Sequence, residues 1–326
     1  MNSSGPVRKT PRSNQFGSML YEREVLALLV AIIMWVAFGL INPRFLTWAG
    51  ITDIIFSSTV IAAGALGSSM VIIAGEWDLS VGSMLALQAT IIALLASSNV
   101  VTNLFVMILV VIVIGMVLGF INGILVSFGG LSSIIVTIGT MFVYRGLCLI
   151  IAGGRWFTSL PAWLTSVGQV STFGIRPSLI IILVLTAILS LFMSQTRLGL
   201  WIYALGGNEN ALRLKGINVR WVKVLVFCTT GVLVGVAALI LAGQYGYVQT
   251  DIGYDYVMAT IAAAIVGGTS AFGGRGRIGG AIIGALLIGI MKTGLVAINI
   301  PAQWYNVVLG ILILLSMTRE MLQKRT

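Results

Sequence analysis

The sequence predicts an all-α protein, a polytopic transmembrane bundle of about ten spans with both termini in the cytoplasm. Two features of its composition favour this class: 58% of the 326 residues are hydrophobic and only 9% are charged. Such a composition is typical of integral membrane proteins and does not suit a soluble domain. The third observation is a series of ten apolar stretches, most of them close to the roughly 20 residues that a helix needs to cross a bilayer.

The predicted spans follow one another along the chain with connections of very different lengths. They cover residues 24–42, 54–74, 80–98, 103–126, 131–151, 177–194, 223–243, 257–271, 279–298 and 304–318. We therefore expect a transmembrane domain over residues 23–319, preceded by a disordered cytoplasmic tail at 1–22 and followed by a cytoplasmic tail at 320–326. The first tail is basic but lacks the apolar core and the cleavage site of a signal peptide.

The basic residues predict the orientation of the bundle, because membrane proteins collect Lys and Arg in their cytoplasmic loops. With the N-terminus inside, only Arg44, Arg155 and Arg176 fall outside, Arg145 and Lys292 fall within spans, and the rest of the 19 basic residues fall inside. The formal charge of +10 is therefore a topology signal, and no nucleic-acid partner is expected.

Two predicted outer loops, residues 153–177 and 244–257, have a distinct composition. The first is rich in aromatic residues, and Pro161 is placed to begin a short helix at the membrane interface. The second combines tyrosines with carboxylates. These features suit an aromatic belt at the headgroups, or alternatively a surface on which an external protein docks. The candidate docking residues are Trp156, Trp163, Asp251 and Asp255.

Missing residue types exclude several kinds of enzyme site. The chain has no His, which removes imidazole bases, Ser-His-Asp triads and His metal ligands. Cys148 and Cys228 lie inside apolar runs, so neither a disulfide framework nor a zinc site is expected. Residues 273–277 are glycine-rich but lack the Lys and Ser/Thr of a phosphate-binding loop, and a tight cytoplasmic turn is expected there. We therefore expect no catalytic residues, no metal and no cofactor bound by this chain.

The connection between the second and third spans, GEWDLSVGS at residues 75–83, places two carboxylates close to apolar runs. Ionisable groups at membrane depth are costly, so Glu76 and Asp78 are candidate pathway or gating residues. The alternative is that Asp78 or Ser80 caps the helix that follows.

Two polar side chains inside spans, Asn122 and Arg145, belong to the same set of candidates. An interhelical hydrogen bond is the alternative for Asn122, and snorkelling to the headgroups is the alternative for Arg145 and Lys292. If Arg145 lines the pathway, it could bond sugar hydroxyls or support a broken helix. Glycines at helical spacing predict close packing between spans. They are Gly115, Gly119 and Gly123 in the fourth span, and Gly280, Gly284 and Gly289 in the ninth.

The polar interruption at residues 195–223 contains a two-turn helix with signals at both ends. Asn208 is placed to cap its N-terminus, and Gly216 suits the left-handed residue past its C-terminus. A helix this short is marginal in water, so we expect it to dock on a surface. Ala211 and Leu214 share one face and could fill an apolar groove. An ordinary surface loop is the alternative.

Taken together and in this order, the motifs resemble the membrane-spanning permeases of bacterial ATP-driven sugar importers, the ribose, xylose, arabinose and autoinducer-2 group. The resemblance covers residues from about 25 to 318. It rests on the segments at 75–83, 122–126, 140–147, 206–219 and 266–274. It implies a homodimer or heterodimer of permeases in the bacterial inner membrane, cytoplasmic ABC ATPase subunits that hold ATP and magnesium, and a periplasmic solute-binding protein. The chain itself would be a transport subunit and not an enzyme.

The resemblance also identifies the 195–223 loop as the one that carries the helix seated in a groove of the ATPase. The residues it implicates are Gly207, Asn208, Glu209, Ala211, Leu212, Leu214, Gly216 and Ile217. Leu212 departs from the family pattern, in which a second Ala is more usual, and Trp77 replaces a more common Ile. Two other functions stay open. One is a permease of the same family for branched-chain amino acids or nucleosides. The other is an ion-coupled secondary transporter in which Glu76, Asp78 and Asp255 relay charge.

Overall fold

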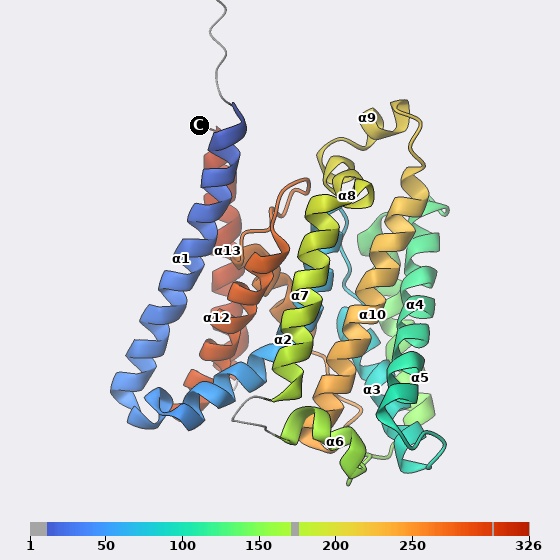
Figure 1. Ribbon diagram of the computed structural model, residues 1–326, viewed down its shortest axis with the longest axis vertical. Coiled ribbons are helices and arrows are strands. Elements are labelled where there is room, and N and C mark those ends of the chain that lie inside the picture. Colours follow the sequence, from blue (N-terminus) through green and yellow to red (C-terminus); the bar gives the residue numbers. More distant parts are fainter. Residues whose placement is uncertain (1–11, 171–175, 302, 326) are drawn as a thin grey trace, which may run out of the picture.

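The computed structural model describes residues 12–170, 176–301 and 303–325 as a bundle of helices (Figure 1). Within these residues the extended pairing is limited to an isolated antiparallel bridge between Phe157 and Val248. The helices are α1 (Arg12–Ile41), the 3-10 helix η1 (Pro43–Leu46), α2 (Trp48–Ile73), α3 (Val81–Ser97), α4 (Leu104–Ser127), α5 (Ser133–Ala152), α6 (Ala162–Gln169), α7 (Pro177–Gln195), α8 (Arg197–Gly207), α9 (Glu209–Leu214), α10 (Val219–Tyr245), α11 (Tyr256–Val266), α12 (Ile278–Ala297) and α13 (Gln303–Arg325).

Each predicted span falls on a helix, but the helices differ in length. Eight helices of the described chain are long and apolar enough to cross a membrane: α1, α2, α4, α5, α7, α10, α12 and α13. The other two, α3 with 17 residues and α11 with 11, are shorter. Helix α11 stops at Val266, before the predicted limit of 271, because the glycines that follow turn the chain and Gly268 takes a φ of +102°. The number of about ten spans therefore stays a prediction.

The two ends of the chain are more helical than the sequence suggested. Helix α1 begins at Arg12, so residues 12–22 of the expected disordered tail are helical, whereas residues 1–11 lie outside the described part. Extending an existing helix costs far less than nucleating one, and no Pro stands in this stretch. At the other end α13 continues to Arg325, past the expected domain limit at 319.

The helices divide into an interior and a periphery. Within an 18-residue apolar stretch of each helix, 83% of the residues are buried in α2 and 72% in α10, against 17% in α1 and 18% in α13. The interior helix α2 is rich in Gly, Ala, Ser and Thr, whereas the outer helices expose Leu, Ile and Val, such as Ile33 and Leu314. Lipid tails are as apolar as these side chains, so hydrophobicity does not separate the interior from the periphery. The small side chains of α2 mark it as an interior helix.

The predicted role of the spaced glycines in helix packing is confirmed. At five of them a Cβ atom would overlap the backbone of another segment, and at Gly289 it would overlap the side chain of Ser58, so the glycines allow segments to pack closely. The contacts are Gly115 with Gly231, Gly119 with Phe227, Gly123 with Val224, Gly280 with Gly267, Gly284 with Ala263, and Gly289 with Ser58.

Two ends of the bundle are named here for the short helices that mark them. The α9 end, at the top of Figure 1, also holds the described start of α1 and the end of α13. The α6 end, at the bottom, holds the turn from α1 to α2 and the connection that follows α10.

Candidate functional site

Residues 74–80, between α2 and α3, form a non-helical segment inside the bundle. The backbone N–H of Trp77 donates to Ser133 Oγ, and that of Leu79 donates to Thr137 Oγ1, both at 3.1 Å. Backbone groups outside a helix need such partners where water is scarce. Two hydroxyls of α5 therefore stabilise the break between α2 and α3.

Asp78 lies within a buried hydrogen-bond network that joins this segment to α4 and α5. Its Oδ1 accepts from the N–H of Ser80 at 2.8 Å and from the hydroxyl of Ser80 at 2.6 Å. Asn122 Nδ2 donates to Ser80 Oγ at 2.8 Å. The Tyr144 hydroxyl lies 3.2 Å from Asn122 Oδ1 and donates to the carbonyl of Leu118 at 2.9 Å. All four polar side chains are buried.

This network settles two of the sequence alternatives. The interhelical hydrogen bond given as the alternative for Asn122 is confirmed by its contact with the Tyr144 hydroxyl of α5. Capping by Ser80 is wrong: Ser80 precedes α3 but its side chain makes no cap bond, because its hydroxyl is engaged by Asp78 and Asn122. Asp78 binds a backbone N–H at this helix start, that of Ser80 itself. Asp78 Oδ2 has no hydrogen-bond partner among the described residues, which marks the carboxylate as the polar group of this network whose burial is least compensated.

Helix α9 has the end signals that the sequence predicted. Asn208 Oδ1 accepts from the N–H of Ala211 at 3.0 Å, and Gly216 takes a φ of +77°. Leu214 is 90% exposed, so the face proposed to fill a groove is open, whereas Leu212 is 4% exposed. Leu212, the residue that departs from the family pattern, therefore anchors α9 to its own bundle and does not present its side chain to a partner.

A line of ion pairs joins α9 to the 74–80 segment. Glu209, the first residue of α9, places Oε2 3.0 Å from Lys223 Nζ and accepts from Arg213 Nε at 3.1 Å. The same Lys223 Nζ lies 2.7 Å from Glu76 Oε1. Burial acts to raise the pKa of Glu209, but the hydrogen bonds and charges of Lys223 and Arg213 outweigh it and hold that pKa below its ordinary value.

Sequence reasoning missed Lys223, which was counted only as a basic residue that sets orientation. A signal was present. The predicted topology brings the end of the second span and the start of the seventh to the same face of the membrane. Glu76 needs a cation there, and Lys223 begins the seventh span.

Glycines bring three connections into backbone contact at the α9 end. Gly75 follows α2, Gly206 is the last residue but one of α8, and Gly273 and Gly274 lie in the turn between α11 and α12 that the sequence predicted. A Cβ on any of the four would crowd the backbone of another connection, and the N–H of Gly274 donates to the carbonyl of Ile73 at 2.8 Å. We call this cluster, residues 75, 206, 273 and 274, the glycine seam.

The two predicted outer loops meet at the α6 end. The N–H of Phe157 donates to the carbonyl of Val248 at 3.0 Å, and the reverse bond measures 2.8 Å. The short helix expected after Pro161 is confirmed as α6. Trp156 is 61% exposed, whereas Trp163 packs partly against the core. The loops therefore form one joined layer and not two separate surfaces.

Part of the 244–257 connection turns into the bundle, and Arg145 holds it there. Arg145 Nη1 donates to the carbonyls of Thr250 at 3.0 Å and Ile252 at 2.9 Å, and its guanidinium lies 4.3 Å from the centre of the Tyr254 ring. Arg145 therefore supports non-helical backbone, which favours that role over snorkelling. The next residue but one, Tyr256, is buried and donates its hydroxyl to a carbonyl of α2 at 2.8 Å.

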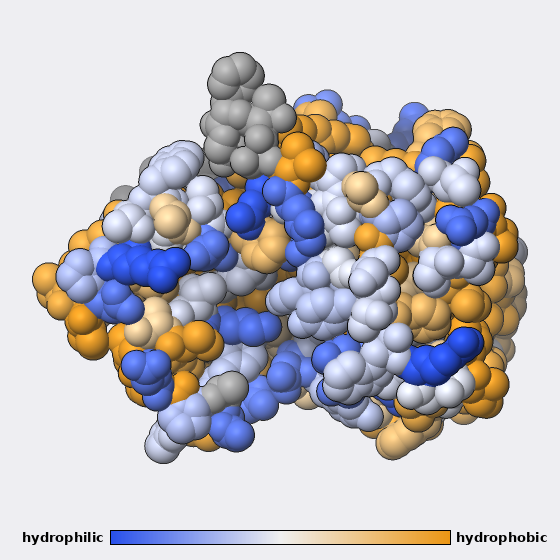
Figure 2. Space-filling model, turned by 90° about the horizontal axis from the view of Figure 1, so that it is seen from below, coloured by the Kyte–Doolittle hydropathy of each residue, from blue (hydrophilic) through white to orange (hydrophobic). Residues whose placement is uncertain are grey.

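An open cavity of about 360 Å³ lies against this inward-turning segment. A second cavity of about 410 Å³ shares Ser57, Tyr245 and Lys292 with it. Figure 2 shows this end hollowed near its middle, with hydrophilic side chains around the hollow and apolar ones at the flanks. Such volumes are in the range of small-molecule sites. The polar and aromatic lining of the first cavity includes Tyr245, Tyr247, Gln249, Asp251, Tyr254, Asp255 and Lys292.

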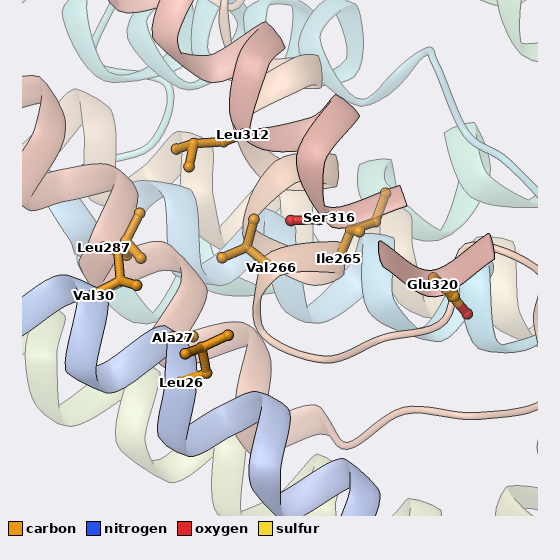
Figure 3. Close-up of a pocket in the computed structure, with 9 residues that line it drawn as sticks. All are labelled: Leu26, Ala27, Val30, Ile265, Val266, Leu287, Leu312, Ser316 and Glu320. Atoms are coloured by element: carbon orange, nitrogen blue, oxygen red, sulfur yellow. The ribbon is translucent and has the colours of Figure 1, made fainter. Parts of the chain in front are cut away.

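A smaller pocket of about 130 Å³ lies between α1, α11, α12 and α13 and is mainly apolar (Figure 3). The carboxylate of Glu320 points away from the apolar side chains, bonding Ser270 Oγ and the N–H of Ala271. With so small a volume and so few polar groups, this pocket does not suit a polar solute.

Comparisons with known proteins agree with the motifs. Residues 50–317 match the family described as "Branched-chain amino acid transport system / permease component". The ribose import permease protein of Haemophilus influenzae is 36% identical over 96% of this chain and 98% of its own length. The D-allose transport system permease protein of Escherichia coli is 36% identical over 91% of this chain and 90% of its own length. The autoinducer 2 import system permease protein of Yersinia enterocolitica is 33% identical over 90% of this chain and 81% of its own length. No solved structure matches.

Proposed function

The chain belongs to this permease family of ABC importers, and from that premise we propose that it forms the membrane pathway through which a sugar or sugar-like solute is imported. The observation that carries the proposal is likeness over nearly the full length to permeases named for ribose, D-allose and autoinducer 2. These relatives favour a sugar over the branched-chain amino acids of the family description. Membership of an importer family also disfavours the ion-coupled alternative.

The proposed arrangement in the bacterial inner membrane places the α9 end in the cytoplasm and the α6 end in the periplasm. The connections at the α9 end carry Arg213, Lys215, Arg275 and Arg277, which supports this orientation. With α3 and α11 completing crossings that the non-helical segments begin, the chain would have ten spans and both termini inside. The exposed apolar faces of the outer helices would contact lipid and a second permease, identical or related.

Transport would follow from the movement of cytoplasmic ATPase partners, which hold ATP and magnesium. Their groove would take the exposed face of α9, including Ala211 and Leu214, and ATP binding would shift this helix. The displaced helix would in turn rearrange the 74–80 segment and open the other side of the bundle. The chain performs no chemistry on the sugar in this scheme.

At the α6 end a periplasmic binding protein would deliver the sugar to the open cavity. Tyrosine rings suit the apolar faces of a sugar, while Asp251, Asp255 and Gln249 offer acceptors for its hydroxyls. Selectivity would lie mainly in the binding protein, because the carboxylates stand in an open and solvated cavity.

The test is uptake by proteoliposomes that contain the chain, its ATPase partner and the binding protein. We expect ATP-dependent uptake of ribose, D-allose or autoinducer 2 and no uptake of leucine or a nucleoside. Leucine or nucleoside uptake would replace the sugar assignment with that alternative. Uptake driven by an ion gradient in vesicles holding this chain alone would overturn the proposal altogether.

A further inference from the structure

Lys223 is the one residue of the described chain that pairs with carboxylates from both α9 and the 74–80 segment. Its Nζ lies 3.0 Å from Glu209 Oε2 and 2.7 Å from Glu76 Oε1. The side chains of Lys223 and Glu76 are 14% and 13% exposed, so solvent screens this pair far less than a surface ion pair.

The ends of this link are attached to different parts of the protein. Glu209 is the first residue of α9, the helix whose Leu214 is open for a partner. Glu76 lies two residues before Asp78, and the N–H of its neighbour Trp77 is held by Ser133 of α5. Movement of Glu209 therefore acts on a segment that is bonded directly to the buried polar network.

The charges make the link sensitive to displacement. One ammonium group stands between two carboxylates, which would repel each other without it. If α9 moves away by a few Å, Lys223 must lengthen its contact with either Glu209 or Glu76. It then keeps only one of its two ion pairs. A pair of discrete arrangements of this kind is what carries coupling between distant sites.

The glycine seam supports the same connection from a second side. Gly206, three residues before Glu209, packs against Gly274 and the carbonyl of Ile73, and Gly75 lies against Gly206. The end of α8 and the start of the 74–80 segment are thus in backbone contact. The seam holds the two connections together, and the ion pairs of Lys223 link α9 to the 74–80 segment beside it.

We propose that Lys223 is a positioning residue that transmits the displacement of α9 to the 74–80 segment through Glu209 and Glu76. This inference rests on the proposed function, in which an ATPase partner moves α9. It assigns to a residue at the start of α10 the step that joins ATP hydrolysis to opening of the pathway.

The experiment compares ATP hydrolysis with and without sugar-loaded binding protein, in proteoliposomes of the complete complex. Lys223→Met keeps the length of the side chain without its charge. Lys215→Met is the matched control, because Lys215 lies in the connection between α9 and α10 and its side chain is exposed. We expect the ratio of stimulated to unstimulated hydrolysis to fall about two- to thirtyfold in Lys223→Met, the range given by changes along coupling networks. Lys223→Arg, which keeps the positive charge beside both carboxylates, should recover part of the ratio.

Glu76→Gln provides a second route, because it removes one half of the link and leaves Lys223 paired with Glu209. It decides the matter if Lys223→Met does not fold. An unchanged ratio in both variants overturns the inference, as does a fall in Lys215→Met equal to that in Lys223→Met. A loss that Lys223→Arg does not recover also overturns it, because that result indicates packing and not charge. A wild-type complex without sugar-stimulated hydrolysis would instead defeat the proposed function, and the inference with it.

Discussion

The two ends of the bundle are held together by different forces. At the α9 end, glycine backbones touch without intervening side chains, and Lys223 pairs with two partly shielded carboxylates. At the α6 end, two connections share a pair of backbone hydrogen bonds, aromatic rings line an open cavity, and Asp251 and Asp255 are exposed. Close backbone contact at the first end leaves little room for its connections to move independently, which suits the proposed transmission of displacement. The open cavity at the second end suits the proposed entry of a solute.

The largest expected effect is at the glycine seam. In Gly206→Val the added Cβ would overlap the carbonyl oxygen of Ile73 and crowd Gly274, both of which belong to backbone that cannot turn aside. We expect destabilisation of about 3 kcal/mol or more, measured as a loss of monodisperse protein and a lower Tm in detergent. Gly207→Ala is the matched control, because a Cβ there meets no atom within 4 Å, and it should stay within about 0.5 kcal/mol. Equal stability of the two variants would contradict a tight seam.

The next effect separates the two faces of α9. Leu214→Asp places a charge on a side chain that is 90% exposed, so the bundle should fold normally while sugar-stimulated ATP hydrolysis is abolished. Leu212→Asp places the same charge at a side chain that is 4% exposed and should lower the Tm, because an unpaired buried charge is costly. Size-exclusion chromatography and ATPase assays on both variants test this. Normal stimulation in Leu214→Asp would rule out docking through that face.

A smaller effect is expected at the α6 end. Changing both Asp251 and Asp255 to Lys reverses the charge of the cavity rim and should raise the concentration of loaded binding protein needed for half-maximal stimulation about tenfold. Leu214→Asp should instead leave hydrolysis unstimulated at every concentration of binding protein, so the two ends give two different kinetic changes. Titration of binding protein against both variants gives the answer, and normal uptake by the double variant would count against docking at this rim.

The smallest effect concerns pH and the α9 end. A carboxyl whose pKa is lowered on folding stabilises the folded state above its ordinary pKa, and the contribution is lost as the pH falls through the lowered value. For Glu209 the ordinary value is 4.5, so its ion pairs should be intact at pH 7 and should weaken only below 4.5. The Tm difference between wild type and Glu209→Gln should therefore be constant down to this value and then shrink. Because Glu209 is 30% exposed, the difference in the free energy of unfolding between the two proteins should be below about 1 kcal/mol.

Particular residues show why some features were predictable. The ends of α9 follow from local chemistry, because the Asn208 cap and the left-handed Gly216 involve only nearby backbone. Arg145 shows the opposite case. A lone Arg within an apolar span suggests snorkelling, and its real partners, the carbonyls of Thr250 and Ile252, are more than a hundred residues away in the sequence.

By itself the sequence determined the all-helical class, the positions of the ten apolar stretches, the glycine spacing and the family, because these depend on composition, short-range periodicity and local motifs. Only the tertiary structure decided that Leu212 faces inward, that the 244–257 connection turns into the bundle, and that Lys223 joins Glu76 to Glu209. These facts depend on which segments meet. In a bundle whose surface is as apolar as its core, hydropathy does not say which face of a helix meets which neighbour.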